Sequence, residues 1–186
     1  MLGIAKVKQP FTYYDFDVDL GGWTNIGGGT NVWAVGGAGR SPNLGIQNLP
    51  QYVSPDVWST RDSSTSVLWL RSPQFQIRIS ASLTFALTGG KHGTPPANES
   101  EVPTGEGATA GGYQFVGLRD VLTGDFVLTA QKDEDPNSTA WIWAGWTEAQ
   151  LAPYLNDGKN YTLDAIDQYV GGWGWFGLSR TRIPGW

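Results

Sequence analysis

The fold class of this chain is decided by the stretch QFQIRISASLTFALT, residues 74–88. Its apolar side chains occupy alternate positions in two runs, Phe75, Ile77 and Ile79, then Leu83, Phe85 and Leu87. Successive side chains of a β-strand point to opposite faces, so this period of two predicts two strands, each with one buried and one polar face. Such strands are typical of antiparallel sheets.

Similar short runs of β-branched and aromatic residues recur along the chain, separated by Gly, Pro, Asn, Asp and Ser. They predict strands over Tyr13–Val18, Asn31–Val35, Ser66–Leu70, Gln74–Ile79, Ser82–Thr88, Tyr113–Arg119, Asp125–Gln131, Thr139–Ala144, Asn160–Gln168 and Gly172–Arg180. The only helix-like stretch is Thr147–Leu155. So many strands exceed what one open sheet comfortably holds, so we expect an all-β fold in which two antiparallel sheets form a jelly-roll-like sandwich.

The domain organisation follows from the length of 186 residues, which predicts a single domain. We expect an N-terminal arm over residues 1–10, the β-sandwich over 11–183 and a C-terminal tail over 184–186. Gly36–Thr65 and Gly89–Gly112 carry little strand signal and are predicted to be projecting loops. Loops of this length often have a function, and Gly89–Gly112 is the better candidate for contacts.

The charge of the chain bears on its partners and location. It has 17 acidic and 12 scattered basic residues, a net charge of −5, so nucleic acid is not expected as a partner. No apolar run approaches the roughly 20 residues that span a bilayer, so we expect no membrane insertion. Met1–Lys8 lack the apolar core of a secretory signal. We therefore expect synthesis in a cytoplasm, with release by lysis, assembly or a dedicated exporter.

Four sequence landmarks occur in order along the chain: Tyr14-Asp15-Phe16-Asp17 with Leu20-Gly21-Gly22-Trp23-Thr24, Leu70-Arg71-Ser72-Pro73-Gln74-Phe75, Leu83-Thr84-Phe85-Ala86-Leu87-Thr88-Gly89-Gly90, and Gly171-Gly172-Trp173-Gly174-Trp175-Phe176. Together they resemble the concanavalin-like jelly-roll modules of the MAM and LamG type, especially those appended to bacterial glycoside hydrolases. The resemblance covers most of the chain and implies a β-sandwich that binds rather than catalyses. We expect neither a catalytic domain nor a secretion signal here, which distinguishes this chain from an accessory module of a secreted hydrolase.

Three carboxylates alternate along one predicted strand, at Asp15, Asp17 and Asp19. On one strand face they would offer hard oxygen ligands to a structural calcium ion. The spacing does not match an EF-hand loop, because Leu20 and Ile26 stand where that loop requires glycine and glutamate. The alternative is a solvated edge face. No other cofactor is expected.

The sequence predicts that the protein is not an enzyme. The acidic cluster Asp133–Asn137 is expected at the tip of a hairpin between Asp125–Gln131 and Thr139–Ala144, with no second acid placed opposite it. His92 is the only histidine and there is no cysteine, so zinc sites with several His or Cys ligands are excluded. A catalytic triad would have to include His92, which lies in a Gly/Pro-rich loop without a nucleophile-elbow motif.

Ten tryptophans distinguish the composition of this chain. Five of them occur at spacings of two or three, at Trp141, Trp143, Trp146, Trp173 and Trp175, and are expected to project on the same side within each strand. Facing inward they belong to the core. Facing outward they form a stacking platform for sugar rings or a contact patch for another protein.

A second set of side chains lies in or near predicted loops and termini, where exposure is expected. These predicted contact residues are Trp23, Trp33, Trp58, His92 and Trp186.

Two functions are compatible with these features. The first is a non-enzymatic virion component, such as a capsid decoration or cement protein, made in the host cytoplasm, located on the virion surface and bound to a protein lattice or a homo-oligomer. The alternative is a stand-alone carbohydrate-binding module located outside the cell. Two exposed aromatic rings beside Asp, Asn or Arg would mark that alternative, with a glycan as ligand. A hydrolase is disfavoured by the missing catalytic set.

Overall fold

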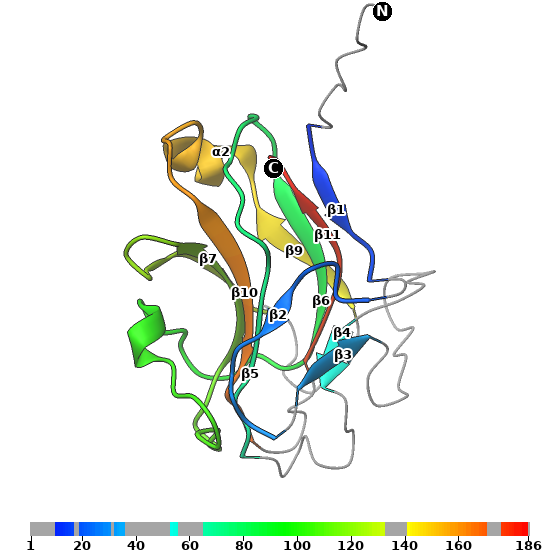
Figure 1. Ribbon diagram of the computed structural model, residues 1–186, viewed down its shortest axis with the longest axis vertical. Coiled ribbons are helices and arrows are strands. Elements are labelled where there is room, and N and C mark those ends of the chain that lie inside the picture. Colours follow the sequence, from blue (N-terminus) through cyan, green and yellow to red (C-terminus); the bar gives the residue numbers. More distant parts are fainter. Residues whose placement is uncertain are drawn as a thin grey trace, which may run out of the picture.

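The computed structural model describes residues 10–16, 19–30, 32–35, 65–132, 141–170 and 176–185, and the backbone of 53–55. These residues form two antiparallel sheets packed face to face (Figure 1), which confirms the predicted all-β sandwich. The jelly-roll course of the strands stays a prediction. In the described part of the chain, no helix is long and apolar enough to cross a membrane.

The larger sheet has six strands. They are β1 (Thr12–Tyr14), β3 (Trp33–Val35), β4 (Val53–Pro55), β6 (Leu83–Thr88), β9 (Ile142–Trp146) and β11 (Gly177–Ile183). Their order is β3-β4-β11-β6-β9, and β1 also pairs with β11. The first strand of the described chain therefore lies beside the last.

The smaller sheet has five strands. They are β2 (Thr24–Asn25), β5 (Leu68–Arg71), β7 (Gln114–Asp120), β8 (Phe126–Ala130) and β10 (Tyr161–Asp167), in the order β2-β5-β10-β7-β8. The short strands β2 and β4 were not predicted.

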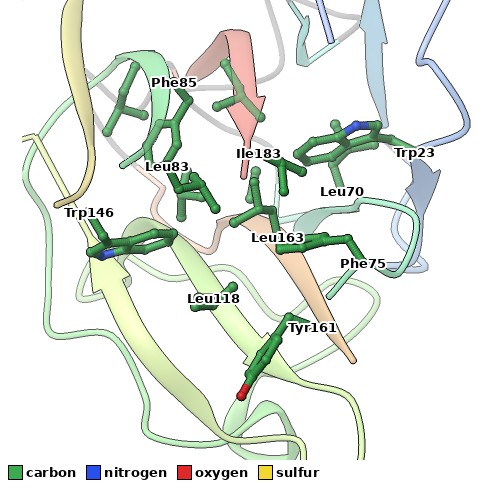
Figure 2. Packing of buried hydrophobic residues seen from close by; sticks show 14 of the residues in the cluster. Trp23, Leu70, Phe75, Leu83, Phe85, Leu118, Trp146, Tyr161, Leu163 and Ile183 are labelled. Carbon is green, nitrogen blue, oxygen red and sulfur yellow. The ribbon is translucent and has the colours of Figure 1, made fainter. Parts of the chain in front are cut away.

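The core lies between the two sheets and contains side chains from both (Figure 2). Phe85 of the larger sheet and Leu163 of the smaller one are completely buried. Phe85 also packs edge-to-face against Trp146, with ring centroids 5.7 Å apart. Aromatic pairs in this geometry add about 0.5–1.5 kcal/mol to what area burial provides.

The predicted helix is confirmed as α2 (Glu148–Leu151) followed by the 3-10 turn η3 (Ala152–Tyr154). It begins with a capping box, in which Thr147 Oγ1 accepts a hydrogen bond from Gln150 N–H and the Gln150 side chain accepts one from Thr147 N–H. Leu151 anchors it in the core. A second 3-10 turn, η2 (Glu99–Glu101), was not predicted.

The predicted hairpin between Asp125–Gln131 and Thr139–Ala144 is wrong. Strand β8 pairs with β7 in the smaller sheet, and β9 pairs with β6 in the larger one. The chain therefore passes from one sheet to the other between β8 and β9. The acidic cluster Asp133–Asn137 lies outside the described residues.

The segment Gln74–Ile79 shows the predicted alternation of burial without forming a strand. Phe75 and Ile77 are 4% and 1% exposed, whereas Arg78 is exposed. Phe75 makes an isolated bridge to Tyr161 of the smaller sheet, and Ile77 makes one to Gly185, just beyond β11 of the larger sheet. The segment thus passes between the two sheets and joins neither ladder.

The prediction that Gly89–Gly112 projects is wrong. This segment packs against the outer face of the smaller sheet, where Val102 and Ala108 are buried with Trp69, Phe115 and Ile166. Figure 1 shows it in green beside β7 and β10. The smaller sheet is thus covered on both faces. Most of Gly36–Thr65 lies outside the described residues.

Candidate ligand-binding face

The outer face of the six-stranded sheet carries a groove of about 240 Å³. It is lined by Tyr13, Asp15, Thr84, Trp143, Arg180 and Arg182. Among the described residues, four large apolar side chains are exposed, and Tyr13 (59%) and Trp143 (54%) are the aromatic ones. Both line this groove, so the exposed aromatic surface of the described chain is concentrated at one place. We call this surface the outer groove.

Strand register explains how the outer groove is assembled. Tyr13 of β1 is opposite Arg182 of β11, which is opposite Thr84 of β6. Trp143 lies on β9, the next strand, opposite Ala86 and two positions along from Gly145, the partner of Thr84. Three strand spacings of about 4.8 Å separate the backbones of β1 and β9, which places the two aromatic residues about 14 Å apart across the sheet. Between them the groove is lined by the small side chain of Thr84.

A register shift in β11 presents two arginines to the outer groove. Leu178 and Ile183 are both completely buried, although strict alternation would put residues five apart on opposite faces. The pairing with β6 shifts between Ser179 and Arg182, and Arg180 has a left-handed φ of 42°. Such a bulge re-aims side chains. Because of it, Arg180 and Arg182 both line the groove.

Arg182 is held in place by an aromatic neighbour. Its guanidinium carbon lies 3.5 Å from the centroid of the Phe11 ring, which is a cation–π contact. Phe11 in turn packs against Tyr13, with ring centroids 6.0 Å apart. The charged and aromatic side chains at this end of the groove therefore support one another.

Trp143 lines three neighbouring hollows. Besides the outer groove, it borders a hollow of about 340 Å³ that includes Gln131 and Gln150, and one of about 280 Å³ that includes Ser82 and Thr147. A ligand on this face can therefore contact Trp143 from either side.

The two tryptophans near Trp143 in the sequence, Trp146 and Trp141, are both buried. Trp146 is three residues from Trp143 and points into the core, because residues three apart in a strand lie on opposite faces. The prediction that all three rings share one side is therefore wrong for Trp146. Trp141 is buried at 2% exposure, and a Cβ at Gly177 would lie 3.0 Å from its ring.

The predicted exposure of Trp23 and Trp33 is wrong. They are 4% and 1% exposed. Trp23 packs edge-on against Tyr14 and Phe16, and Trp33 packs against Phe176 with ring centroids 5.5 Å apart. Both rings therefore belong to the core, although their positions are in a loop and in an edge strand. Trp58, Trp186, Trp173 and Trp175 lie outside the described residues.

His92 is not an exposed loop side chain. It is half-buried, and its ring stacks on Tyr169 with centroids 3.5 Å apart and an interplanar angle of 4°. Its carbonyl oxygen accepts a hydrogen bond from the side chain of Gln131. His92 does not line the outer groove.

The basis for the predicted calcium site does not hold. Strand β1 ends at Tyr14, and Phe16 has a left-handed φ of 56°, so Asp15 and Asp19 do not alternate along one extended strand. Asp15 lines the outer groove, and Asp19 accepts a hydrogen bond from Gly21 N–H. Asp17 lies outside the described residues, among which no cluster of three potential metal ligands occurs. Calcium binding stays a prediction without the support of strand alternation.

A second charged cluster lies on the outer face of the smaller sheet, under Gly89–Gly112. Asp164 is fully buried there and accepts hydrogen bonds from Trp69, Thr162 and Arg71. Glu99 bridges Arg71 and Arg119. Burial alone would raise the pKa of Glu99, but the hydrogen bonds from Arg119 and Arg71 lower it below its usual range. Because both carboxylates form ion pairs with arginine, this cluster holds the segment Gly89–Gly112 on the smaller sheet.

Glu106 connects neighbouring loops through hydrogen bonds, and its lowered pKa predicts how stability depends on pH. Its carboxylate accepts hydrogen bonds from Thr65 Oγ1 (2.7 Å), from Thr30 N–H (3.0 Å) and from Ser66 Oγ (2.9 Å), which lower the pKa of Glu106 to about 2. Because the pKa is lowered in the folded state, this stabilisation is present above pH 4.5 and is lost as the pH falls toward 2. We expect Glu106→Gln to be less stable than wild type in urea at pH 7, with the difference shrinking at pH 2.5. A constant difference would contradict this assignment.

Sequence reasoning did not identify most of the outer groove. The sequence leaves the direction of the Trp143 side chain open, and it places Asp15 in a predicted calcium site. The outward position of Thr84 follows from the alternation in residues 83–88. Tyr13, Arg180 and Arg182 come together only because the first and last strands pair, which no local pattern reports.

Comparison with known proteins gives only distant, structural similarity. Neither a protein-family model nor a curated protein sequence matches this chain. Among solved structures, the chain is similar to a cleaved adhesin domain of Lys-gingipain, with 13% sequence identity and a TM-score of 0.48, over 93% of this chain and 98% of that one.

Proposed function

We propose that this protein is a non-catalytic binding module that holds saccharide chains in the outer groove. The observation that carries the proposal is the placement of Tyr13 and Trp143, the exposed aromatic side chains among the described residues, on one groove with Asp15, Arg180 and Arg182 beside them. Aromatic rings supply apolar faces on which sugar rings stack, and charged and polar groups then fix orientation.

The shape of the groove supports a chain of sugars as ligand. It is open to solvent, and its two aromatic residues are separated by the width of two intervening strands, β11 and β6. A single sugar ring contacts only one of them. An oligosaccharide lying across the strands contacts both, and the ends of a longer chain can extend into solvent.

The proposal is tested by affinity gel electrophoresis against a panel of soluble neutral and acidic polysaccharides. Wild type is expected to be retarded by at least one of them. Stacking on an aromatic ring is worth about 1–3 kcal/mol by analogy with nucleic-acid bases, or about 5- to 150-fold in Kd. Trp143→Ala is expected to lose that much affinity.

The matched control is Leu122→Ala, which removes an 88% exposed apolar side chain at the turn between β7 and β8. It is expected to bind like wild type. Retention that is unchanged in Trp143→Ala, or no retention of wild type on any polysaccharide, would contradict the proposal.

A virion decoration role, the first function predicted from the sequence, is the second candidate. It relies on the arm over residues 1–10, on Trp58 and on Trp186, nearly all outside the described residues, and on Trp23 and Trp33, which are buried. We rank it below saccharide binding because no described surface favours a protein lattice.

A further inference from the structure

We infer that the saccharide bound in the outer groove is acidic, with carboxylate or sulfate groups that pair with Arg180 and Arg182. This inference rests on the proposed function and names the class of ligand. It starts from charge: two guanidinium groups and one carboxylate line the groove, in a chain whose net charge is −5. The outer groove is therefore locally basic on an acidic protein.

The geometry of β11 supports the same inference. Regular alternation from the buried Leu178 would turn Arg180 and Arg182 toward the core and Ile183 toward solvent. The shift between Ser179 and Arg182 reverses this orientation. Arg180 has a left-handed φ of 42°, which residues other than glycine rarely adopt. Backbone strain of this kind is concentrated at functional sites. Here the strained residue is one of the two that bring positive charge to the groove.

The chemistry of arginine fits an anionic sugar. A guanidinium group is planar and always charged, and it donates paired hydrogen bonds to carboxylate or sulfate oxygens. Arg182 is steadied by Phe11 and lies directly opposite Tyr13 across the β1–β11 pair. A sugar stacked on Tyr13 therefore has a guanidinium beside it, within reach of an acidic substituent.

The test compares polygalacturonate, dextran sulfate and a neutral β-glucan as probes in affinity gels. We expect retention by at least one acidic polymer, stronger than by the glucan and weakened by added salt. Arg182→Gln and Arg180→Gln are each expected to lose about tenfold or more in affinity, as for other hydrogen bonds to charged groups. Lys91→Gln, which removes an exposed positive charge outside the groove, is expected to bind like wild type.

Arg180→Gly separates binding from folding. Glycine suits the left-handed backbone at this position, so this variant is expected to unfold at the same or a higher urea concentration than wild type. It nevertheless loses the guanidinium group and is expected to lose affinity for the acidic polymer. A variant that is stable and binds poorly cannot be explained by misfolding.

Three results would overturn the inference. Retention by the neutral glucan alone would refute the acidic ligand and leave the proposed function standing. Retention by an acidic polymer that is unchanged in both arginine variants would place the anion elsewhere. If none of the three polymers retards the protein while another polysaccharide of the panel does, the acidic class is wrong. If no polysaccharide binds at all, the proposed function fails as well.

Discussion

Replacing Asp164 with alanine is expected to lower the free energy of unfolding by about 3–5 kcal/mol, because the change leaves buried partners without their charge. The Asp164 carboxylate accepts hydrogen bonds from Trp69 Nε1 (2.8 Å), Thr162 Oγ1 (2.8 Å) and Arg71 (2.6 Å). Without it, Arg71 keeps only Glu99 as an ion-pair partner among the described residues. The measurement is urea denaturation followed by tryptophan fluorescence.

Two further variants make this result specific. Glu148→Gln changes an exposed carboxylate at the start of α2 and is expected to alter stability by no more than about 0.5 kcal/mol. Asp164→Asn keeps the shape and is expected to fall between wild type and the alanine variant. A loss below about 1 kcal/mol in Asp164→Ala is the size expected for an exposed ion pair. It would show that the buried network does not hold the segment Gly89–Gly112 on the smaller sheet.

Replacing Gly145 with alanine is expected to destabilise the fold by about 2–4 kcal/mol through backbone strain and overpacking. Gly145 has a φ of 135°, and a Cβ there would lie 2.0 Å from the carbonyl oxygen of Leu83. That oxygen belongs to β6, so the added methyl group forces β9 away from its partner strand. The change should also displace Trp143 and weaken saccharide binding.

Gly111→Ala is the matched control for Gly145→Ala. A Cβ at Gly111 would have no neighbour within 4 Å, and its φ is not in the left-handed region. We expect this variant to be as stable as wild type or slightly more so, since alanine restricts the unfolded chain. Equal losses of stability in the two variants would mean that the contact with β6 is not the reason why position 145 requires glycine.

Strong alternation predicted burial in both Gln74–Ile79 and Ser82–Thr88, but only the second became a strand. Leu83, Phe85 and Leu87 alternate with polar or small residues, and β6 begins and ends within one residue of its prediction. Partner strands were not predictable, because a period of two reports which side chains share a face and not which strand lies alongside. That is why β8 and β9 were expected to form a hairpin although they belong to different sheets.

The candidate site was less accessible to sequence reasoning than the fold. The exposure of a tryptophan depends on what covers its face, so Trp143 is exposed while Trp23 and Trp33 are buried. The two arginines depend on a bulge in β11, which adds one residue between the buried positions Leu178 and Ile183 and breaks the alternation on which strand predictions rest.

The most direct test of saccharide binding in the outer groove is an NMR titration of the tryptophan indole N–H signals. The protein is labelled with ¹⁵N, the signal of Trp143 is identified with Trp143→Phe, and an equimolar mixture of neutral and uronic-acid oligosaccharides is added. The account predicts that the Trp143 signal shifts in a saturable way, while the signal of Trp69, which is buried on the outer face of the smaller sheet, stays in place. A fixed Trp143 signal, or shifts confined to Trp69, would contradict it.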